Sequence, residues 1–198
     1  MTLGKFFFQY RSYTPLPFII PMLLFARPTI TTMIIGAIFV IIGESFRFWG
    51  VSYAGSETRT TGNVGASSLV TQGPFSYVRN PLYLGNILMY FGISIMSNSL
   101  VPFLQILSIV YFSIQYYYII LEEEGFLKEK FKDKYDHYFK NVNRFLPKFT
   151  AYDETKRSKL GQDLKAAYVS EKRTFQAAFI SILTVSYTHL TLPTTPYV

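Results

Sequence analysis

The sequence contains no cysteine, and its 198 residues include only two histidines. The missing thiols exclude a disulfide scaffold, a cysteine nucleophile and Cys-ligated zinc or iron–sulfur centres. Two histidines are too few for a histidine-based metal cluster, so we expect no metal site. Charge is also scarce, because 16% of the residues are charged while 49% are hydrophobic and 18% aromatic. This composition excludes a disordered tail, a collagen-like fibre and a coiled coil.

The apolar residues are gathered in four blocks. A helix needs about 20 apolar residues, with a range of roughly 17–25, to cross the hydrocarbon core of a bilayer, and the last three blocks fall in that range. The first block is shorter and carries three prolines, which a span tolerates only where neighbouring helices cover the freed carbonyls. We therefore predict an all-α fold, a multi-pass transmembrane helical bundle. The blocks are Thr14–Ala26, Thr29–Trp49, Leu82–Asn98 and Leu100–Leu121.

The distribution of Lys and Arg predicts the topology. The formal net charge is +7, and thirteen of the 19 basic residues follow Leu121. Four spans with both ends inside satisfy the positive-inside rule, so we expect the N-terminus and the C-terminal region on the cytoplasmic side of a microbial cell membrane. The basic excess then favours contact with anionic lipid headgroups. No groove-reading motif accompanies the charge, and we expect no nucleic-acid partner.

The segment Glu122–Pro147 has a different pattern, with six acids and six bases. Apolar side chains recur in it at spacings of 4, 4, 3 and 4 residues, which is one stripe along a helix. We predict a cytoplasmic amphipathic helix that lies along the bundle with its aromatic stripe inward. The stripe consists of Leu127, Phe131, Tyr135, Tyr138 and Val142.

The last part of the chain is predicted to begin as a polar surface segment, Lys148–Arg173, before the apolar run Thr174–Thr184. The ten residues Val185–Thr194 resemble a translated sequencing-library adapter. We expect Val185–Val198, including His189, to be of artificial origin, and the natural chain to continue into a further span. The alternative is a genuine polar tail.

These observations predict four parts of the chain. Residues 1–50 would form an N-terminal transmembrane hairpin, and residues 51–147 a catalytic core with two spans and the cofactor-binding motifs. Residues 148–184 would hold the polar segment and the start of another span, followed by the adapter-like residues 185–198.

The connection Val51–Pro81 is rich in Gly, Ser and Thr but contains neither a G-x-G-x-x-G nor a Walker loop. No alternation of strands and helices appears, which argues against a soluble Rossmann methyltransferase or dehydrogenase. The connection ends in a Gly-Pro turn at Gly73, followed by Arg79 and the Asn80-Pro81 pair. Asn80 can cap the following helix, and proline suits its first turn.

These residues resemble a known family. The run Arg79–Gly85 (RNPLYLG) resembles the R-H-P-x-Y-x-G motif of the isoprenylcysteine carboxyl methyltransferase and phospholipid N-methyltransferase superfamily. Glu123–Leu127 (EEGFL) is similar to its E-E-x-x-L motif, and the resemblance covers Leu69–Pro147. One departure is Asn80, which stands where the family has His. The family's following F…Y…Y…R…P pattern is matched by Phe131, Tyr135, Tyr138, Arg144 and Pro147.

The resemblance implies an integral-membrane enzyme that uses S-adenosylmethionine at the cytoplasmic ends of its spans. Carboxylates there can accept hydrogen bonds from the cofactor's ammonium or ribose diol. Arg79 and Arg144 are the predicted catalytic residues and can hold a carboxylate. Tyrosine rings, including Tyr77, can lie beside the sulfonium. The predicted cofactor-binding residues are Asn80, Tyr83, Gly85, Glu123, Glu124 and Tyr135.

Several of these features also have a structural interpretation. The acids Glu122–Glu124 suit the start of an amphipathic helix, where they favour the helix dipole. Arg79 suits a headgroup anchor, and Tyr116–Tyr118 an interfacial aromatic belt. Glu44 and Arg47 lie three residues apart near the inner end of a predicted span. They are either a structural ion pair or contacts to the headgroup of the methyl acceptor.

The sequence therefore leaves three functions open. The favoured one is methyl transfer to a membrane-embedded lipid or lipidated acceptor. The second is an NADPH-dependent membrane reductase of a sterol or isoprenoid, which the adjacent acids Glu123 and Glu124 disfavour because the 2′-phosphate calls for basic residues. The third is a non-enzymatic membrane carrier or scaffold. The acceptor's identity stays open between an isoprenylcysteine carboxylate, a phosphatidylethanolamine amine and an anionic lipid headgroup, which would favour Arg47 nearby.

Overall fold

The computed structural model describes residues 2–55, 66–152 and 162–191. Within these residues the regular elements are helices, and the β-type pairing is confined to an isolated bridge between Val78 and Asn143. The predicted all-α class is therefore confirmed. The elements are α1 (Leu3–Tyr10), α2 (Leu16–Leu24), α3 (Ile30–Ala54), the 3-10 turn η2 (Gly73–Ser76), α4 (Pro81–Ser97), α5 (Phe103–Phe131), α6 (Asp133–Asn141) and α7 (Leu164–Thr191).

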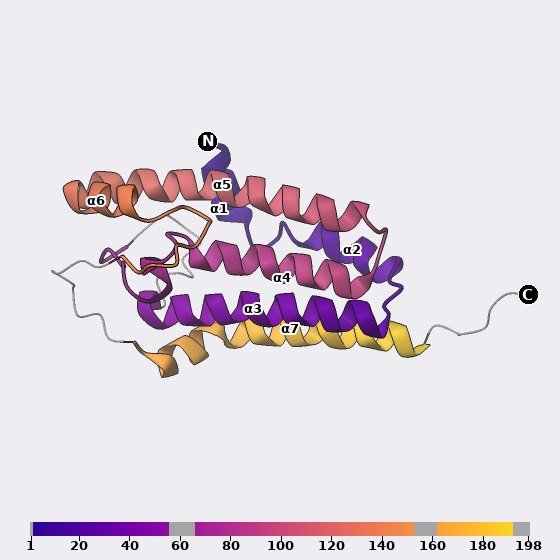
Figure 1. Cartoon of the computed structure of the whole chain (residues 1–198). Coiled ribbons are helices and arrows are strands. Elements are labelled where there is room, and N and C mark those ends of the chain that lie inside the picture. The colour runs from indigo at the N-terminus through magenta and orange to yellow at the C-terminus, as the bar shows by residue number, and fades with distance from the viewer. Residues whose placement is uncertain (1, 56–65, 153–161, 192–198) are drawn as a thin grey trace, which may run out of the picture.

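The long helices lie side by side in the order α5, α4, α3, α7 (Figure 1). Helix α1 packs on α5, and α2 contacts both α4 and α7. Helix α6 turns back beside the end of α5, next to the loop that leads into α4 (Figure 1). The predicted motif residues therefore gather at one end of the bundle.

Glycines allow α3 and α4 to approach closely. A Cβ atom added to Gly43 would lie 2.6 Å from the carbonyl oxygen of Gly85, and one added to Gly85 would lie 2.6 Å from that of Gly43. Gly92 has the same relation to the carbonyl of Gly36, also at 2.6 Å. The seven-residue spacing on each helix keeps these glycines on one face, so the two backbones meet without intervening side chains.

Two helices in the described part of the chain, Ile30–Ala54 and Phe103–Phe131, are long and apolar enough to cross a membrane. Pro81–Ser97 is a shorter apolar helix. Much of the outer surface of α3 and α5 is apolar, with side chains such as Ile34, Ile41, Phe103 and Ile106 more than half exposed. Exposed apolar faces of this kind suit lipid contact.

Two predicted elements differ in the structure. Thr14–Ala26 contains only the nine-residue α2, whose length of about 14 Å is less than one bilayer crossing, so the prediction of four spans is not confirmed. The single amphipathic helix predicted for Glu122–Pro147 is wrong, because α5 continues to Phe131 and α6 starts afresh. Between them Lys132 has a φ of 45°, which interrupts the helix. The stripe nevertheless stays inward, since Tyr135, Tyr138 and Val142 form a buried cluster with Leu127 and Phe131 packed against it.

Helix α7 begins at Leu164, inside the segment predicted to be a polar surface stretch. The apolar run Thr174–Thr184 is thus the middle of a 28-residue helix that packs along α3. The helix continues into the adapter-like residues as far as Thr191, and residues 192–198 lie outside the described part. A helical conformation does not test where those residues come from, so their artificial origin stays a prediction.

Candidate functional site

Three predicted site residues form one ion-pair cluster, the Arg79–Glu124–Arg144 cluster, at the motif end of the bundle. The Arg79 Nε and Nη2 atoms donate to Glu124 Oε1 at 3.1 and 2.9 Å. Arg144 Nη2 donates to Glu124 Oε2 at 2.5 Å. The Glu124 side chain is 9% exposed, and its bonds raise the pKa of Arg144 above the ordinary value for arginine. Both arginines are therefore directed at one buried carboxylate.

Arg79 has further structural bonds. Its Nη1 atom donates to the carbonyls of Phe139 and Val142 at 2.8 and 2.6 Å, and its guanidinium lies 4.1 Å from the centre of the Phe139 ring. These contacts close the C-terminal end of α6. The alternative of a simple headgroup anchor does not fit a side chain that is 8% exposed.

The segment after α6 covers the motif through backbone hydrogen bonds. Arg79 N donates to the Asn143 carbonyl at 2.8 Å, and Lys148 N donates to the Tyr77 carbonyl at 2.9 Å. The turn before the motif requires Gly73, whose φ is 60° and whose added Cβ would meet the Tyr53 ring. Two stretches some 65 residues apart are thus fixed to each other.

Asn80 stands at the N-cap of α4 and Pro81 opens the helix, as predicted. The Asn80 side chain does not cap the helix, however. Its Nδ2 atom donates instead to the carbonyl of Arg144 at 3.2 Å. The predicted capping bond is wrong because the covering segment offers the amide a partner on the other side.

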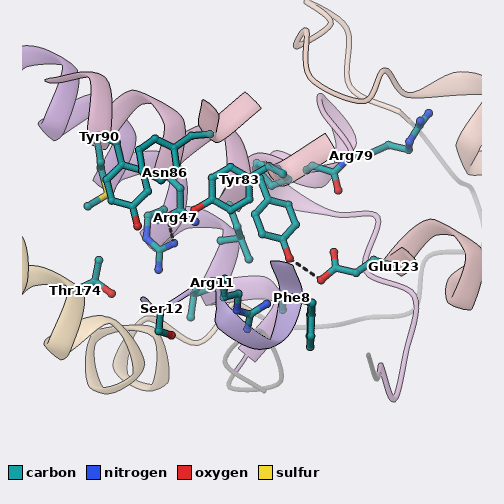
Figure 2. Close-up of a pocket in the computed structure, with 18 of the residues that line it drawn as sticks. Phe8, Arg11, Ser12, Arg47, Arg79, Tyr83, Asn86, Tyr90, Glu123 and Thr174 are labelled. Atoms are coloured by element: carbon teal, nitrogen blue, oxygen red, sulfur yellow. Dashed lines mark hydrogen bonds between the residues drawn. The ribbon is translucent and has the colours of Figure 1, made fainter. Parts of the chain in front are cut away.

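Glu123 lies one residue before Glu124 but has a different environment. It accepts a hydrogen bond from the Tyr83 hydroxyl at 2.6 Å (Figure 2). Figure 2 shows the Arg79 guanidinium extending away from this pair. Arg11, from the connection between α1 and α2, lies close enough to interact electrostatically with both Tyr83 and Glu123. Arg11 was not predicted as a site residue, because it lies outside both sequence motifs.

Glu123 and Tyr83 line a cavity of about 570 Å³. The size is within the range of small-molecule sites, about 300–1,000 Å³. Its motif end includes Asn80, Tyr135 and Tyr138, whereas its deeper walls are largely apolar and come from α2, α4, α5 and α7. The deeper lining includes Met22, Met89, Ile93, Phe112 and Ala178.

Tyrosine rings form part of the cavity wall. The Tyr83 and Tyr116 rings are stacked with their centres 4.8 Å apart. Tyr116 is therefore a buried part of the cavity wall and not a member of an interfacial belt. At the motif end, burial raises the pKa of Tyr135 and of Tyr138 above the ordinary value for tyrosine, and the Tyr138 hydroxyl donates to the Phe75 carbonyl at 2.7 Å.

Gly85 lies outside the cavity lining, against Gly43 and the Arg47 side chain. Its predicted contact with a cofactor stays a prediction. Arg47 does line the cavity, and it forms an ion pair with Glu171 of α7 at 2.7 Å. Glu171 was missed because 124 residues separate it from Arg47.

A family match covers the part of the chain that contains the Arg79–Gly85 and Glu123–Leu127 motifs. The model of the phospholipid methyltransferase family matches residues 31–134, just over half of the chain. The chain belongs to the phospholipid methyltransferase family. The predicted superfamily is thereby confirmed, and methyl transfer at a membrane lipid is the activity that the family suggests.

One relative of this chain is the cobalt-zinc-cadmium resistance protein CzcN of Cupriavidus metallidurans. The two sequences are 29% identical over 118 residues. The match covers 60% of the present chain and 50% of CzcN, so the chain spans about half the length of that relative. No solved structure matches. Arg11, Arg144 and Glu171 lie outside the family match, while Arg47, Arg79, Tyr83, Glu123 and Glu124 lie within it.

Proposed function

We propose that the protein transfers a methyl group from S-adenosylmethionine to a membrane-embedded lipid or lipidated acceptor. The observation that supports this most directly is the single cavity that joins the Tyr83–Glu123 pair to an apolar interior between helices. A polar cofactor and an apolar acceptor need such a two-part space. The membership of the phospholipid methyltransferase family supports the same activity.

The residues at the motif end fit S-adenosylmethionine. Glu123 accepts one bond from Tyr83, and a carboxylate has further lone pairs for an ammonium or a ribose diol. The Tyr83 and Tyr116 rings offer faces to a cation. Arg11 adds a positive charge for the cofactor's carboxylate. When bound, the cofactor supplies an electrophilic methyl group on a sulfonium.

In this proposal the Arg79–Glu124–Arg144 cluster positions the segment after α6 and does not contact the cofactor. Glu124 is engaged by both arginines, so we assign the contact to the cofactor's ammonium or diol to Glu123. The cluster holds the segment after α6 over the cavity, where Asn80 and Tyr135 also lie. Methyl displacement depends on alignment and exclusion of water more than on a titratable base.

The deeper cavity suits the apolar part of the acceptor. Side chains of α4, α5 and α7 line it, including Ile93, Phe112 and Ala178. The net charge of +7 favours anionic headgroups at the membrane surface around the cavity. We propose that the acceptor's tail occupies this part while its nucleophile reaches the Tyr83–Glu123 pair.

Equilibrium binding to detergent-purified protein tests this proposal against its alternatives. We expect S-adenosylmethionine to bind, and NADPH to bind far more weakly, because the Glu123 carboxylate in the cavity repels a 2′-phosphate. Preferential binding of NADPH would favour a reductase, and binding of neither would favour a carrier or scaffold. Either result would contradict the proposed methyl transfer.

A further inference from the structure

The outer face of α5 changes from apolar to charged near the motif end of the bundle. Ile114, Tyr117 and Leu121 are exposed on this helix and largely apolar. The exposed side chains that follow on it include Lys128 and Glu129. On a helix that crosses a bilayer, such a change marks the membrane surface. We therefore expect the bilayer surface just beyond Leu121.

The segment after α6 returns to this same level of the bundle. It runs from α6 back toward the start of α4 (Figure 1). Arg144 donates to Glu124 of α5, and its guanidinium lies 5.3 Å from the centre of the Tyr117 ring. Phe145, the next residue, packs against the buried cluster that contains Ile119. The segment thus lies beside the last apolar turns of α5.

Two large apolar side chains of this segment are turned away from the protein. Leu146 is 76% exposed, and Phe149 is fully exposed. The neighbouring Lys148 N donates to the carbonyl of Tyr77, whose ring lies 6.0 Å from that of Trp49. Tryptophan and tyrosine are typical of the membrane–water interface. Both exposed side chains therefore lie at the level where the headgroups and upper acyl chains of a bilayer are expected.

Basic side chains accompany this apolar pair. Lys148 Nζ donates to the carbonyl of Asn141, and the preceding residue, Lys140, is exposed. Apolar residues flanked by lysines are typical of segments that lie in the membrane interface, where the apolar part enters the lipid and the lysines attract anionic headgroups. Because the pair lies beside the exposed apolar face of α5, one bilayer can cover both surfaces.

We propose that the segment after α6 inserts Leu146 and Phe149 into the bilayer interface at the motif end of the bundle. Backbone hydrogen bonds to Tyr77 and Arg79 hold one side of this segment, and lipid covers the other. The segment that covers the motif is then a membrane-contacting element outside the family match, which ends at residue 134. This contact does not depend on the reaction that the cavity supports.

Quenching of a fluorescent label by lipid tests this contact. The sequence has no cysteine, so Leu146→Cys and Phe149→Cys each provide a single site for an NBD label. The labelled proteins are reconstituted into nanodiscs of phosphatidylcholine and phosphatidylglycerol, with and without lipids that carry a nitroxide high on the acyl chain. Ile114→Cys on the apolar face of α5 is the positive control. Lys134→Cys, an exposed position beyond the end of α5, is the negative control.

We expect the nitroxide lipids to quench the labels at positions 146 and 149 about as strongly as the label at 114, and several-fold more than the label at 134. A loss of fluorescence at position 146 no larger than at 134 overturns the proposal. A label at 146 that is shielded from aqueous iodide but not quenched by lipid also overturns it, because protein would then cover the position. Melting temperatures show whether each variant is folded, and if Leu146→Cys is not, position 149 decides by the same criteria.

Discussion

At the scale of single residues, the two adjacent glutamates have different surroundings. Both were predicted to bind the cofactor, and nothing in the run Glu122–Gly125 distinguishes them. The structure pairs Glu124 with Arg79 and Arg144, whereas Glu123 accepts from Tyr83 inside the cavity. These partners lie 20 to 45 residues away in the sequence, so the run of acids itself could not show that the two glutamates have different partners.

Glu123→Gln should weaken S-adenosylmethionine binding. The change keeps the shape of the side chain and removes the charge, and a charge-assisted hydrogen bond contributes about 1.5–3 kcal/mol, or roughly 10–100-fold in affinity. Calorimetric titration of the purified variant measures the effect. Glu129→Gln, on the exposed side of α5, is the matched control and should bind like the wild type. Equal affinities of Glu123→Gln and wild type would remove Glu123 from the site.

Glu124→Gln should act mainly on stability. It leaves Arg79 and Arg144 beside an uncharged side chain, and breaking a buried ion pair costs about 3–5 kcal/mol. Thermal unfolding in detergent should show a clear drop in melting temperature, larger than that of Glu123→Gln. A melting temperature equal to that of the wild type would show that the cluster does not hold the covering segment in place.

Asn80→His should retain most activity with an unchanged pH profile. The imidazole N–H can replace the amide as donor to the Arg144 carbonyl, and displacement of the methyl group needs no base at this position. Asn80→Ala loses the bond, at a cost of about 0.5–1.5 kcal/mol. Rates measured from pH 5 to 9 provide the check. A faster Asn80→His enzyme with a new acid limb near pH 6.5, where histidine titrates, would contradict this view.

At the scale of the elements, the contact between α3 and α4 depends on glycines of the two helices that face each other. This contact was not predicted from the sequence. Gly85 was predicted to bind the cofactor, and the structure places the backbone of Gly43 against it. The apolar blocks predicted helices α3, α4 and α5 well, because long apolar runs leave little choice of structure in a bilayer. The break at Lys132 was not predictable from the stripe, since the apolar spacing continues across it.

Gly43→Val should separate α3 from α4. The added side chain would collide with the Gly85 carbonyl, and overpacking of this kind costs about 1–3 kcal/mol. Gly125→Ala on α5 is the control, because an added Cβ there meets nothing within 4 Å. Alanine is the better helix former, so that variant should melt at or above the wild-type temperature. A Gly43→Val protein as stable as Gly125→Ala would contradict the close packing of the two backbones.

At the scale of the whole molecule, the cavity combines parts that are distant in the sequence. The family match ends at residue 134, but three residues beyond it contribute to this region. Arg144 pairs with Glu124, Thr174 lines the cavity, and Glu171 pairs with Arg47. The paired motifs predicted that their residues gather at one end of the bundle, because two motifs on neighbouring helices leave few arrangements. They could not predict the deeper half, which depends on how α2 and α7 pack beside α4.

Resequencing of the coding region from an independent library tests the end of the chain. Residues Val185–Val198 are expected to be replaced by a different reading frame that extends the apolar run. Recovery of the same codons would show that these residues, His189 among them, belong to the protein.

Transfer of a labelled methyl group tests the proposed function most directly. Membranes that contain the protein are incubated with S-adenosylmethionine labelled on its methyl group, and lipids and proteins are then separated. We expect label in the lipid or lipidated fraction, strongly reduced with Glu123→Gln and unchanged with Glu129→Gln. Label that stays entirely with the cofactor, or that appears equally in membranes without the protein, would contradict methyl transfer by this chain.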